Sequence, residues 1–243
     1  MGAAAFGFLM ASSPNTHATP IAFQNGTASF SQPCAGGHSP DLSVDGNFSA
    51  SNRGWAIAKT CATPLDDTDP HTAVWETTAD FTATQLDFGL HQLFGSQHLI
   101  GRFRLSVTSD DRSTFADGQD NGGDVIANWT VLTGASVSGP GSLIFSTLGD
   151  DSILVGGIVP AIGAYTVEYT GSFADITGVR LEVLEDALLP FDGPGLQPTN
   201  GNFVLTELTL DASDVIETPE PGTFALLAVA LAGIGFARFR KVA

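Results

Sequence analysis

Apolar and polar residues alternate with a period of two through the middle of the chain, which is typical of strands with one buried and one wet face. The alternation is clearest in residues 85–90, 102–107 and 179–183. Gly, Asn, Asp and Pro interrupt it about every 8–12 residues, the turn spacing of an all-β sandwich. Further strands are predicted at 21–30, 72–77, 125–132, 142–147, 153–155, 165–170 and 204–210. Residues 19–214 contain no amphipathic stretch of helix length, so one all-β domain is predicted there.

The N-terminus departs from this alternation. Residues 2–11 are small and apolar, and Thr16-His17-Ala18 follows them. This order predicts a signal peptide over residues 1–18, cleaved after Ala18. Lys and Arg are absent before Arg53, so the basic opening of a usual signal peptide is missing. A merely apolar N-terminus is the alternative interpretation.

The C-terminus, residues 215–243, carries a single apolar run at 224–237. This run predicts one hydrophobic helix that is shorter than the ~20 residues needed to span a bilayer. Basic residues directly after it can reach the membrane surface and would stay cytoplasmic, which places the rest of the chain on the outer side. The helix is therefore expected to hold the protein at a membrane.

Three features follow one another in a fixed order at this end: Pro219, Glu220 and Pro221, then the apolar run, then Arg238, Arg240 and Lys241. This order resembles the PEP-CTERM sorting signal of Gram-negative bacteria. The resemblance implies that an exosortase, a membrane cysteine transpeptidase, recognises the Pro-Glu-Pro sequence and removes the tail. It also implies delivery to the cell surface or the exopolysaccharide matrix. A plain tail anchor is the alternative.

Composition narrows the class of protein. The formal net charge is −17, and three of the nine basic residues lie in the last six positions. A nucleic-acid binder is excluded on this ground, because phosphate contacts need a basic face. With 43% hydrophobic residues and 17 Phe, the chain can fill a core and is not a disordered acidic polymer.

Cys34 and Cys61 are the only cysteines. In an oxidising compartment, an even number of cysteines in an exported chain favours a disulfide, which would contribute on the order of 3 kcal/mol. A zinc site is disfavoured because the two thiols lack the Cys-x-x-Cys spacing of structural zinc. A Cys34–Cys61 disulfide is therefore predicted.

The strand order resembles the discoidin-type, galactose-binding-like jelly-roll β-sandwich across most of residues 20–213. The motifs that carry the resemblance are Ala28-Ser29-Phe30-Ser31, Val44-Asp45-Gly46-Asn47, Gly54-Trp55, the strands near 86 and 102–107, Trp129-Thr130-Val131, Val179-Arg180-Leu181, and Asn202-Phe203 through Thr206-Glu207-Leu208. In carbohydrate-binding modules of this fold, an Asp of the Asp-Gly-Asn turn and a Glu of the closing strand help to hold a structural calcium.

The matching positions here are Asp45, with Asn47 beside it, and Glu207. Because Ca²⁺ takes six to eight oxygen ligands, carboxylates together with loop carbonyls suit it. The alternative is that Asp45-Gly46 forms only a hairpin turn and that Glu207 is a solvated strand residue. Trp55 likewise has two interpretations, a core residue or a ring that stacks on sugar, and the core is favoured.

An acidic stretch at 110–124 offers a second calcium hypothesis. Counted from Asp117, Gln119, Asn121 and Gly122 suit an EF-hand loop, but Asn128 stands where the bidentate Glu is required. A noncanonical calcium loop and a hydrated surface loop both stay open, and the hydrated loop is the commoner outcome.

The chain lacks the motifs of an active site. Its five histidines, His17, His38, His71, His91 and His98, never form the i, i+4 pair with Glu of a zinc protease. The sequence contains no nucleophile elbow, P-loop or dinucleotide fingerprint. Asp66, Asp67 and Asp69 suggest a carboxylate pair for glycoside hydrolysis, but Pro64 and Pro70 frame them as a loop.

The sequence therefore predicts an exported, non-enzymatic surface or matrix protein that binds polysaccharide with the support of Ca²⁺. Two alternatives stay open. One is an inert structural protein of the matrix without a ligand pocket. The other, less favoured, is a surface glycoside hydrolase.

Overall fold

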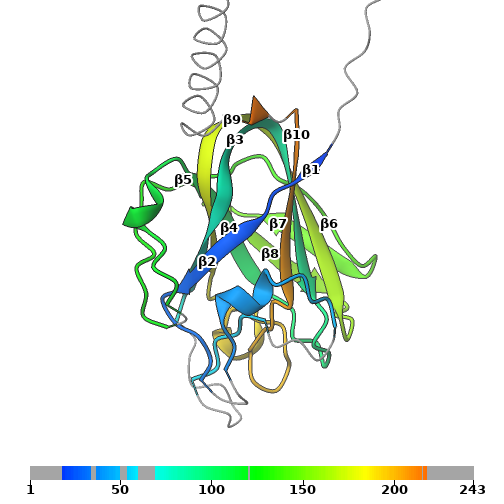
Figure 1. The fold of residues 1–243 in the computed structure, drawn as a ribbon. Helices are drawn as coiled ribbons and strands as arrows, with labels where there is room; N and C mark the ends of the chain where they lie inside the picture. Colours follow the sequence, from blue (N-terminus) through cyan, green and yellow to red (C-terminus); the bar gives the residue numbers. More distant parts are fainter. Residues whose placement is uncertain are drawn as a thin grey trace, which may run out of the picture.

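Two long strands determine the architecture of the computed structural model, which describes residues 18–33, 37–49, 54–59, 69–119, 121–214 and 216–217. They are β3 (His71–Gln92) and β9 (Gly163–Val183), which run antiparallel to each other (Figure 1). Their register shifts three times between Glu76 and Gln85. Each strand therefore bends in its middle and contributes to both faces of the fold.

The first half of β3 and the second half of β9 lie in one face. There β2 (Phe23–Ala28) pairs with β3, and β4 (Arg102–Thr108) pairs with β9. Next to β4 come β8 (Ile153–Gly157) and then β7 (Leu143–Thr147) at the end of the sheet. The short β5 (Thr130–Val131) also pairs with β4. This face thus reaches from β2 to β7.

The other halves of the two long strands form the second face. There β10 (Glu207–Ser213) pairs with β3, β1 (Thr19–Pro20) pairs with β10, and β6 (Ser136–Ser138) pairs with β9. At the bend, β11 (Ile216–Glu217) pairs with Thr82 and Phe81. The strands therefore belong to one continuous sheet that curls over itself, and the predicted all-β sandwich is confirmed.

The helical content of the described residues is limited to short 3₁₀ turns, namely η1 (Pro40–Ser43), η2 (Arg112–Thr114) and η3 (Pro190–Asp192). Most of the predicted strands are present, but within 125–132 only Thr130–Val131 is a strand, β10 begins at Glu207 rather than at 204, and β6 was not predicted. Two further differences concern continuity. Ranges 72–77 and 85–90 belong to one strand, as do 165–170 and 179–183, because the register shifts bend the chain without ending the pairing.

Alternate residues of the facing strands form the core between the two faces. Phe88 and Tyr169 meet edge to face, and Phe103 stacks on Tyr165. The Tyr165 hydroxyl donates a 2.9 Å hydrogen bond to the Ile100 carbonyl, so its polar end is satisfied inside the core. Burial raises the pKa of both tyrosines above the ordinary value.

Trp55 is fully buried, which confirms it as a core residue. Its ring packs edge to face against Trp75 and Phe203, and its indole N–H donates a 3.0 Å bond to the Phe30 carbonyl. The preceding residue must be glycine, because Gly54 has φ +53° and a Cβ there would collide with the Leu205 carbonyl oxygen. The Gly-Trp pair therefore contributes to the packing of the core.

Several predicted features lie outside the described residues: residues 1–17 of the predicted signal peptide, Cys34 and Cys61, and the tail residues Pro219, Glu220, Pro221, Arg238, Arg240 and Lys241. The structure therefore does not test the predictions made for these residues. No helix within the described ranges is long and apolar enough to cross a membrane.

Candidate functional site

The turn at Asp45 and the start of β10 come together, as the sequence resemblance implied. Gly46 has φ +76°, a conformation that suits glycine in a turn, and its N–H donates a 3.0 Å bond to Glu207 Oε1. The Asp45 carboxylate accepts a 2.9 Å bond from the Asn47 N–H. Asp45, Gly46, Asn47 and Glu207 are called the Glu207 site below.

The loop that carries this turn covers Glu207 from outside. Glu207 pairs with His91 across β10 and β3, so both side chains point to the same outer side of the sheet. Phe48, from the loop, packs edge to face on His91 at 4.9 Å. Glu207 is consequently only 4% exposed although it lies on the outer side of a sheet. The interpretation of Glu207 as a solvated strand residue is wrong.

One oxygen of this buried carboxylate lacks a partner in the part of the chain that the structure describes. Glu207 Oε1 accepts the Gly46 N–H, whereas Oε2 is buried and has no hydrogen-bond partner among the described residues. Burial, together with the nearby charge of Asp45, raises the pKa of Glu207 to about 6, and the backbone N–H groups of Gly46 and Asn47 oppose the rise. A buried acceptor of this kind calls for a proton or a cation.

The chemistry of the Glu207 site fits a hard cation. Two carboxylates and the oxygens of a tight turn are the ligand types that Ca²⁺ prefers. Within the described ranges, no three His, Cys, Asp or Glu side chains converge on one point that could hold a metal. A cation at Glu207 would therefore need Asn47 and backbone oxygens to complete its ligands.

The acidic stretch at 110–124 uses its carboxylates within the loop. Asp110 accepts bonds from the backbone and side-chain N–H groups of Asn128, and Asp117 accepts bonds from the Thr27 hydroxyl and the Gln119 N–H. Burial raises the pKa of Asp117, but these and related hydrogen bonds outweigh it and hold the pKa below its ordinary value. The geometry favours a structured loop over a calcium loop.

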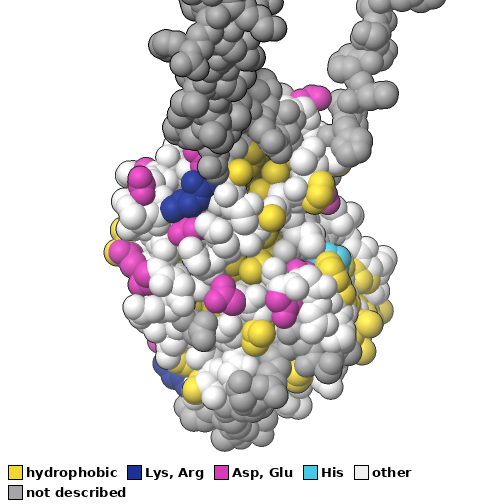
Figure 2. Space-filling view, viewed as in Figure 1, with side chains coloured by type: hydrophobic (Ala, Val, Ile, Leu, Met, Phe, Trp, Pro, Cys, Tyr) yellow, Lys and Arg dark blue, Asp and Glu magenta, His cyan; other side chains and the backbone are white. Residues whose placement is uncertain are grey.

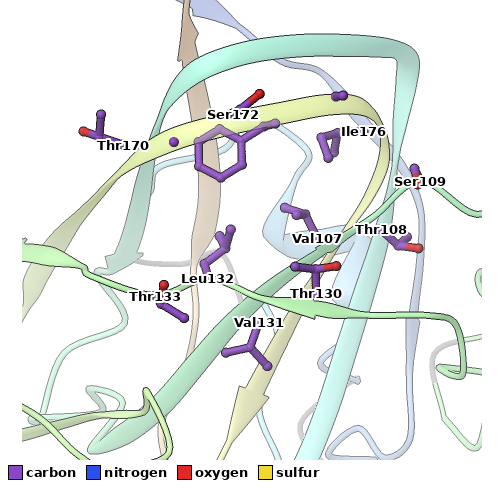
Figure 3. Close-up of a pocket in the computed structure, with 13 residues that line it drawn as sticks. Val107, Thr108, Ser109, Thr130, Val131, Leu132, Thr133, Thr170, Ser172 and Ile176 are labelled. Atoms are coloured by element: carbon purple, nitrogen blue, oxygen red, sulfur yellow. The ribbon is translucent and has the colours of Figure 1, made fainter.

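A pocket of about 330 Å³ lies at the bend of β9, between β5 and residues 170–174 (Figure 3). Val107, Leu132 and Ile176 are almost completely buried and form its apolar part. Its rim carries five hydroxyl side chains that make no hydrogen bond to any described residue: Ser109, Thr130, Thr133, Thr170 and Ser172. This set of residues is called the hydroxyl pocket.

The lining of the hydroxyl pocket contains no charged side chain and includes one aromatic ring, that of Phe173. Its volume is at the lower end of the roughly 300–1,000 Å³ of small-molecule sites. Free hydroxyls can both donate and accept hydrogen bonds, and an aromatic ring can pack on an apolar face. The pocket therefore suits a neutral, hydroxyl-rich molecule.

Sequence reasoning missed this pocket. Its hydroxyl residues come from three separated segments, 108–109, 130–133 and 170–172, and none of these segments carries a recognisable motif. The single signal is the run Trp129-Thr130-Val131-Leu132-Thr133, in which threonines flank apolar residues.

The other residues considered for catalysis, the aspartates at 66–69 and the histidines, do not form a cluster in the described part of the chain. Asp66 and Asp67 lie outside the described residues, and Asp69 is exposed and lies 3.5 Å from the Lys59 ammonium. His98 contacts Phe94 and the Gly95 carbonyl, and burial lowers its pKa although this carbonyl opposes the shift. These contacts do not assemble the acid and base of a hydrolase.

Comparison with protein families places residues 217–241 in the PEP-CTERM protein-sorting motif. The motif begins at Glu217, the last residue of β11, and includes the Pro-Glu-Pro sequence and the basic tail. The predicted sorting signal is confirmed. No curated protein matches the chain.

Among solved structures, the chain is similar to CpGH89CBM32-5 from Clostridium perfringens, in complex with GalNAc-β-1,3-galactose. The two are 14% identical, with 76% of this chain and 92% of that chain covered and a TM-score of 0.43. It is also similar to CBM32-3 from a family 31 glycoside hydrolase of the same organism, at 10% identity, 79% and 90% coverage and a TM-score of 0.43.

Proposed function

We propose that this chain is an exported, non-enzymatic surface protein that binds a neutral polysaccharide in the hydroxyl pocket. The sorting motif at 217–241 supports export and processing at the cell envelope by an exosortase-type transpeptidase. Delivery to the outer surface or extracellular matrix of a Gram-negative bacterium belongs to the same proposal. The observation that carries the binding function is the uncharged rim of free hydroxyls around an apolar floor.

The charge of the protein supports a neutral ligand. The formal net charge of −17 disfavours polysaccharides that contain uronic acids or sulfate, because both partners would be anionic. A neutral glycan avoids this repulsion. It can form hydrogen bonds with the rim and place an apolar sugar face against Phe173 or the floor.

The test is calorimetric titration of the full chain, in detergent, with a panel of neutral polysaccharides and their oligosaccharides. Thr130→Val and Thr133→Val remove rim hydroxyls at constant shape, and each is expected to weaken binding about 3–10-fold, the effect of one hydrogen bond. Thr166→Val is the matched control, because Thr166 is an exposed threonine of β9 outside the pocket. Unchanged affinity in both rim variants would remove the pocket from the proposal.

A uniformly blank panel would favour the alternative of an inert structural matrix protein. A polysaccharide that is shortened during the titration would instead favour the surface hydrolase, with Asp66, Asp67 and Asp69 as the residues to replace.

Ca²⁺ at the Glu207 site is the second part of the proposal, with a supporting role away from the hydroxyl pocket. Glu207 and the pocket lie toward opposite ends of the fold, because β10 runs from Glu207 to Ser213 and β11 then pairs at the bend beside the pocket. The buried, unpartnered Oε2 of Glu207 supports a bound cation, with Asp45 and Asn47 as further ligands. The ion would stabilise the loop at 44–49.

Calcium binding is tested by titration of the full chain in parallel with thermal melts. Ca²⁺ is expected to raise the melting temperature, as any ligand does that prefers the folded state. Glu207→Gln and Asp45→Asn are expected to abolish the rise, whereas Glu168→Gln, on β9, is expected to keep it. A rise that persists in both site variants would contradict the proposed ligands.

A further inference from the structure

β7 is the last strand of its sheet, with β8 on one side and no described strand on the other. The Ile158 N–H donates to the Ser142 carbonyl and the Leu148 N–H to the Ser152 carbonyl. These two bonds determine which backbone N–H and C=O groups of β7 point toward β8. By the alternation of an antiparallel pair, the backbone groups of Phe145 and Thr147 point to the open side. This edge therefore offers unused donors and acceptors.

The edge lacks the features that protect most edge strands. Natural edges carry charges, prolines or bulges that discourage pairing. β7 reads Leu-Ile-Phe-Ser-Thr, with no charge and no proline, and its pairing with β8 is regular over all five residues. Ile144 is 63% exposed and Ile158, just after β8, is 78% exposed. β7 together with Ile158 is called the neutral edge.

Partly buried apolar side chains lie along the same margin. Val137, Leu143 and Phe145 pack against the core but keep part of their surface in solvent. Hydrophobic side chains gather on the right-hand side of the molecule in Figure 2, the side on which Figure 1 places β6. A strand added to β7 would cover these side chains.

The charge distribution points to the occupant. Between Asp124 and Glu168 only Asp150 and Asp151 are charged, and Asp150 is ion-paired at 2.8 Å with Arg102. The rest of the chain carries the other acidic residues, so two copies repel each other across most of their surfaces. The neutral edge is a place where two copies can meet without bringing unpaired carboxylates together.

We propose that the neutral edge is a self-association surface, at which β7 of one copy pairs antiparallel with β7 of a second copy. A two-fold axis at Phe145 would bring its backbone opposite that of its counterpart and continue the sheet through both copies. The exposed side chains of Ile144 and Ile158 would then lie near the interface. This proposal is independent of polysaccharide binding.

Sedimentation equilibrium of the full chain, in a density-matched detergent that accommodates the apolar run at 224–237, tests the proposal. The wild-type chain is expected to form a dimer whose dissociation constant falls as salt rises from about 0.05 M to 0.5 M, because salt screens the repulsion between the two copies. Ile144→Lys is expected to weaken the dimer by at least about tenfold, since it places a charge at the edge.

Ile126→Lys is the matched control, because Ile126 is 76% exposed and lies in the loop at 110–129, away from β7. It introduces the same charge and is expected to leave the dimer intact. Thr147→Pro is a second variant that removes an outward N–H without touching a bond to β8. Circular dichroism melts establish that each variant is folded.

A wild-type chain that stays monomeric at every salt concentration would overturn the proposal. So would a dimer that Ile144→Lys and Thr147→Pro leave unchanged, or one that Ile126→Lys weakens equally. A dimer that weakens as salt rises would also overturn it, because such a dimer would be held by ion pairs.

Discussion

Glu207 shows at the scale of one residue how a strand position becomes a candidate binding site. Its carboxylate is polar and lies on the outer side of a sheet, yet the loop at 44–49 covers it. Burial and the Asp45 charge raise its pKa to about 6, whereas 4.5 is the ordinary value. The folded chain therefore binds this proton more tightly than the unfolded chain does.

The sign of the resulting pH dependence follows from this difference. In the absence of metal, the free energy of unfolding is expected to fall as pH rises from about 4.5 to about 6, because the buried carboxylate loses its proton in that window. The loss attributable to Glu207 should be about 1–2 kcal/mol. Chemical denaturation at several pH values, with chelator present, measures it.

Glu207→Gln should flatten the curve in this window, and Glu168→Gln should leave it as in the wild type. Parallel curves for the wild type and Glu207→Gln would show that the carboxylate titrates alike in the folded and unfolded chains. Ca²⁺ added above pH 6 should restore stability, since the cation replaces the proton.

The location of individual residues in the fold was predictable from the sequence where a motif was present. The Asp-Gly-Asn turn and the Glu of the closing strand predicted that Asp45 and Glu207 lie close together, and Gly-Trp predicted a core tryptophan. The burial of Glu207 could not be predicted, because it depends on how a distant loop crosses the sheet. The hydroxyl pocket could not be predicted either, since isolated Ser and Thr residues give no periodic signal.

At the scale of elements, the loop at 110–129 depends on one aromatic anchor. Phe115 is almost fully buried, contacts the Trp129 ring edge to face at 5.3 Å, and fills the space beside Gly178. The guanidinium of Arg180 lies over the Trp129 ring, 5.4 Å from its centroid. The acidic residues of the loop only join its turns to each other and to Thr27.

Phe115→Ala is therefore expected to release the loop. It should lower the free energy of unfolding by about 3 kcal/mol, the usual cost of such a truncation, and open the loop to limited proteolysis. Ile126→Ala changes an exposed position of the same loop. It should alter the free energy of unfolding by no more than about 0.5 kcal/mol and leave the rate of proteolytic cleavage close to that of the wild type. Equal protection of Phe115→Ala and wild type would contradict the anchor.

Most strands were predictable from their alternation, but the continuity of β3 and β9 was not. Residues 77–84 lack a clear period of two in burial, because the register shifts there turn side chains away from strict alternation. A sequence pattern predicts the two regular halves of such a strand and reads the bend as a loop. The prediction of a strand at 125–132 was wrong for another reason: only Thr130 and Val131 pair with a neighbouring strand, whereas Ile126 is 76% exposed and the Trp129 ring lies against Arg180.

At the scale of the whole molecule, the composition disfavoured a nucleic-acid binder, and the match at residues 217–241 confirmed the predicted sorting signal. The strongly acidic surface, the segment between Asp124 and Glu168 with only two charged residues, and the uncharged hydroxyl pocket form one pattern. We therefore expect anionic partners to be repelled, and neutral partners to bind at the hydroxyl pocket or at the neutral edge. The sequence gives the net charge, and the folded structure shows in addition where the charged and uncharged surfaces lie.

Titration of the wild-type full chain with a neutral polysaccharide and with a uronic-acid polysaccharide of similar length, side by side in one calorimeter, is the decisive comparison. Binding of the neutral polymer that is insensitive to salt, with no heat from the acidic polymer, is the predicted result, because the hydroxyl pocket holds no charged side chain. Binding of the acidic polymer as tightly as the neutral one, or of neither, would contradict a neutral polysaccharide as the ligand of this protein.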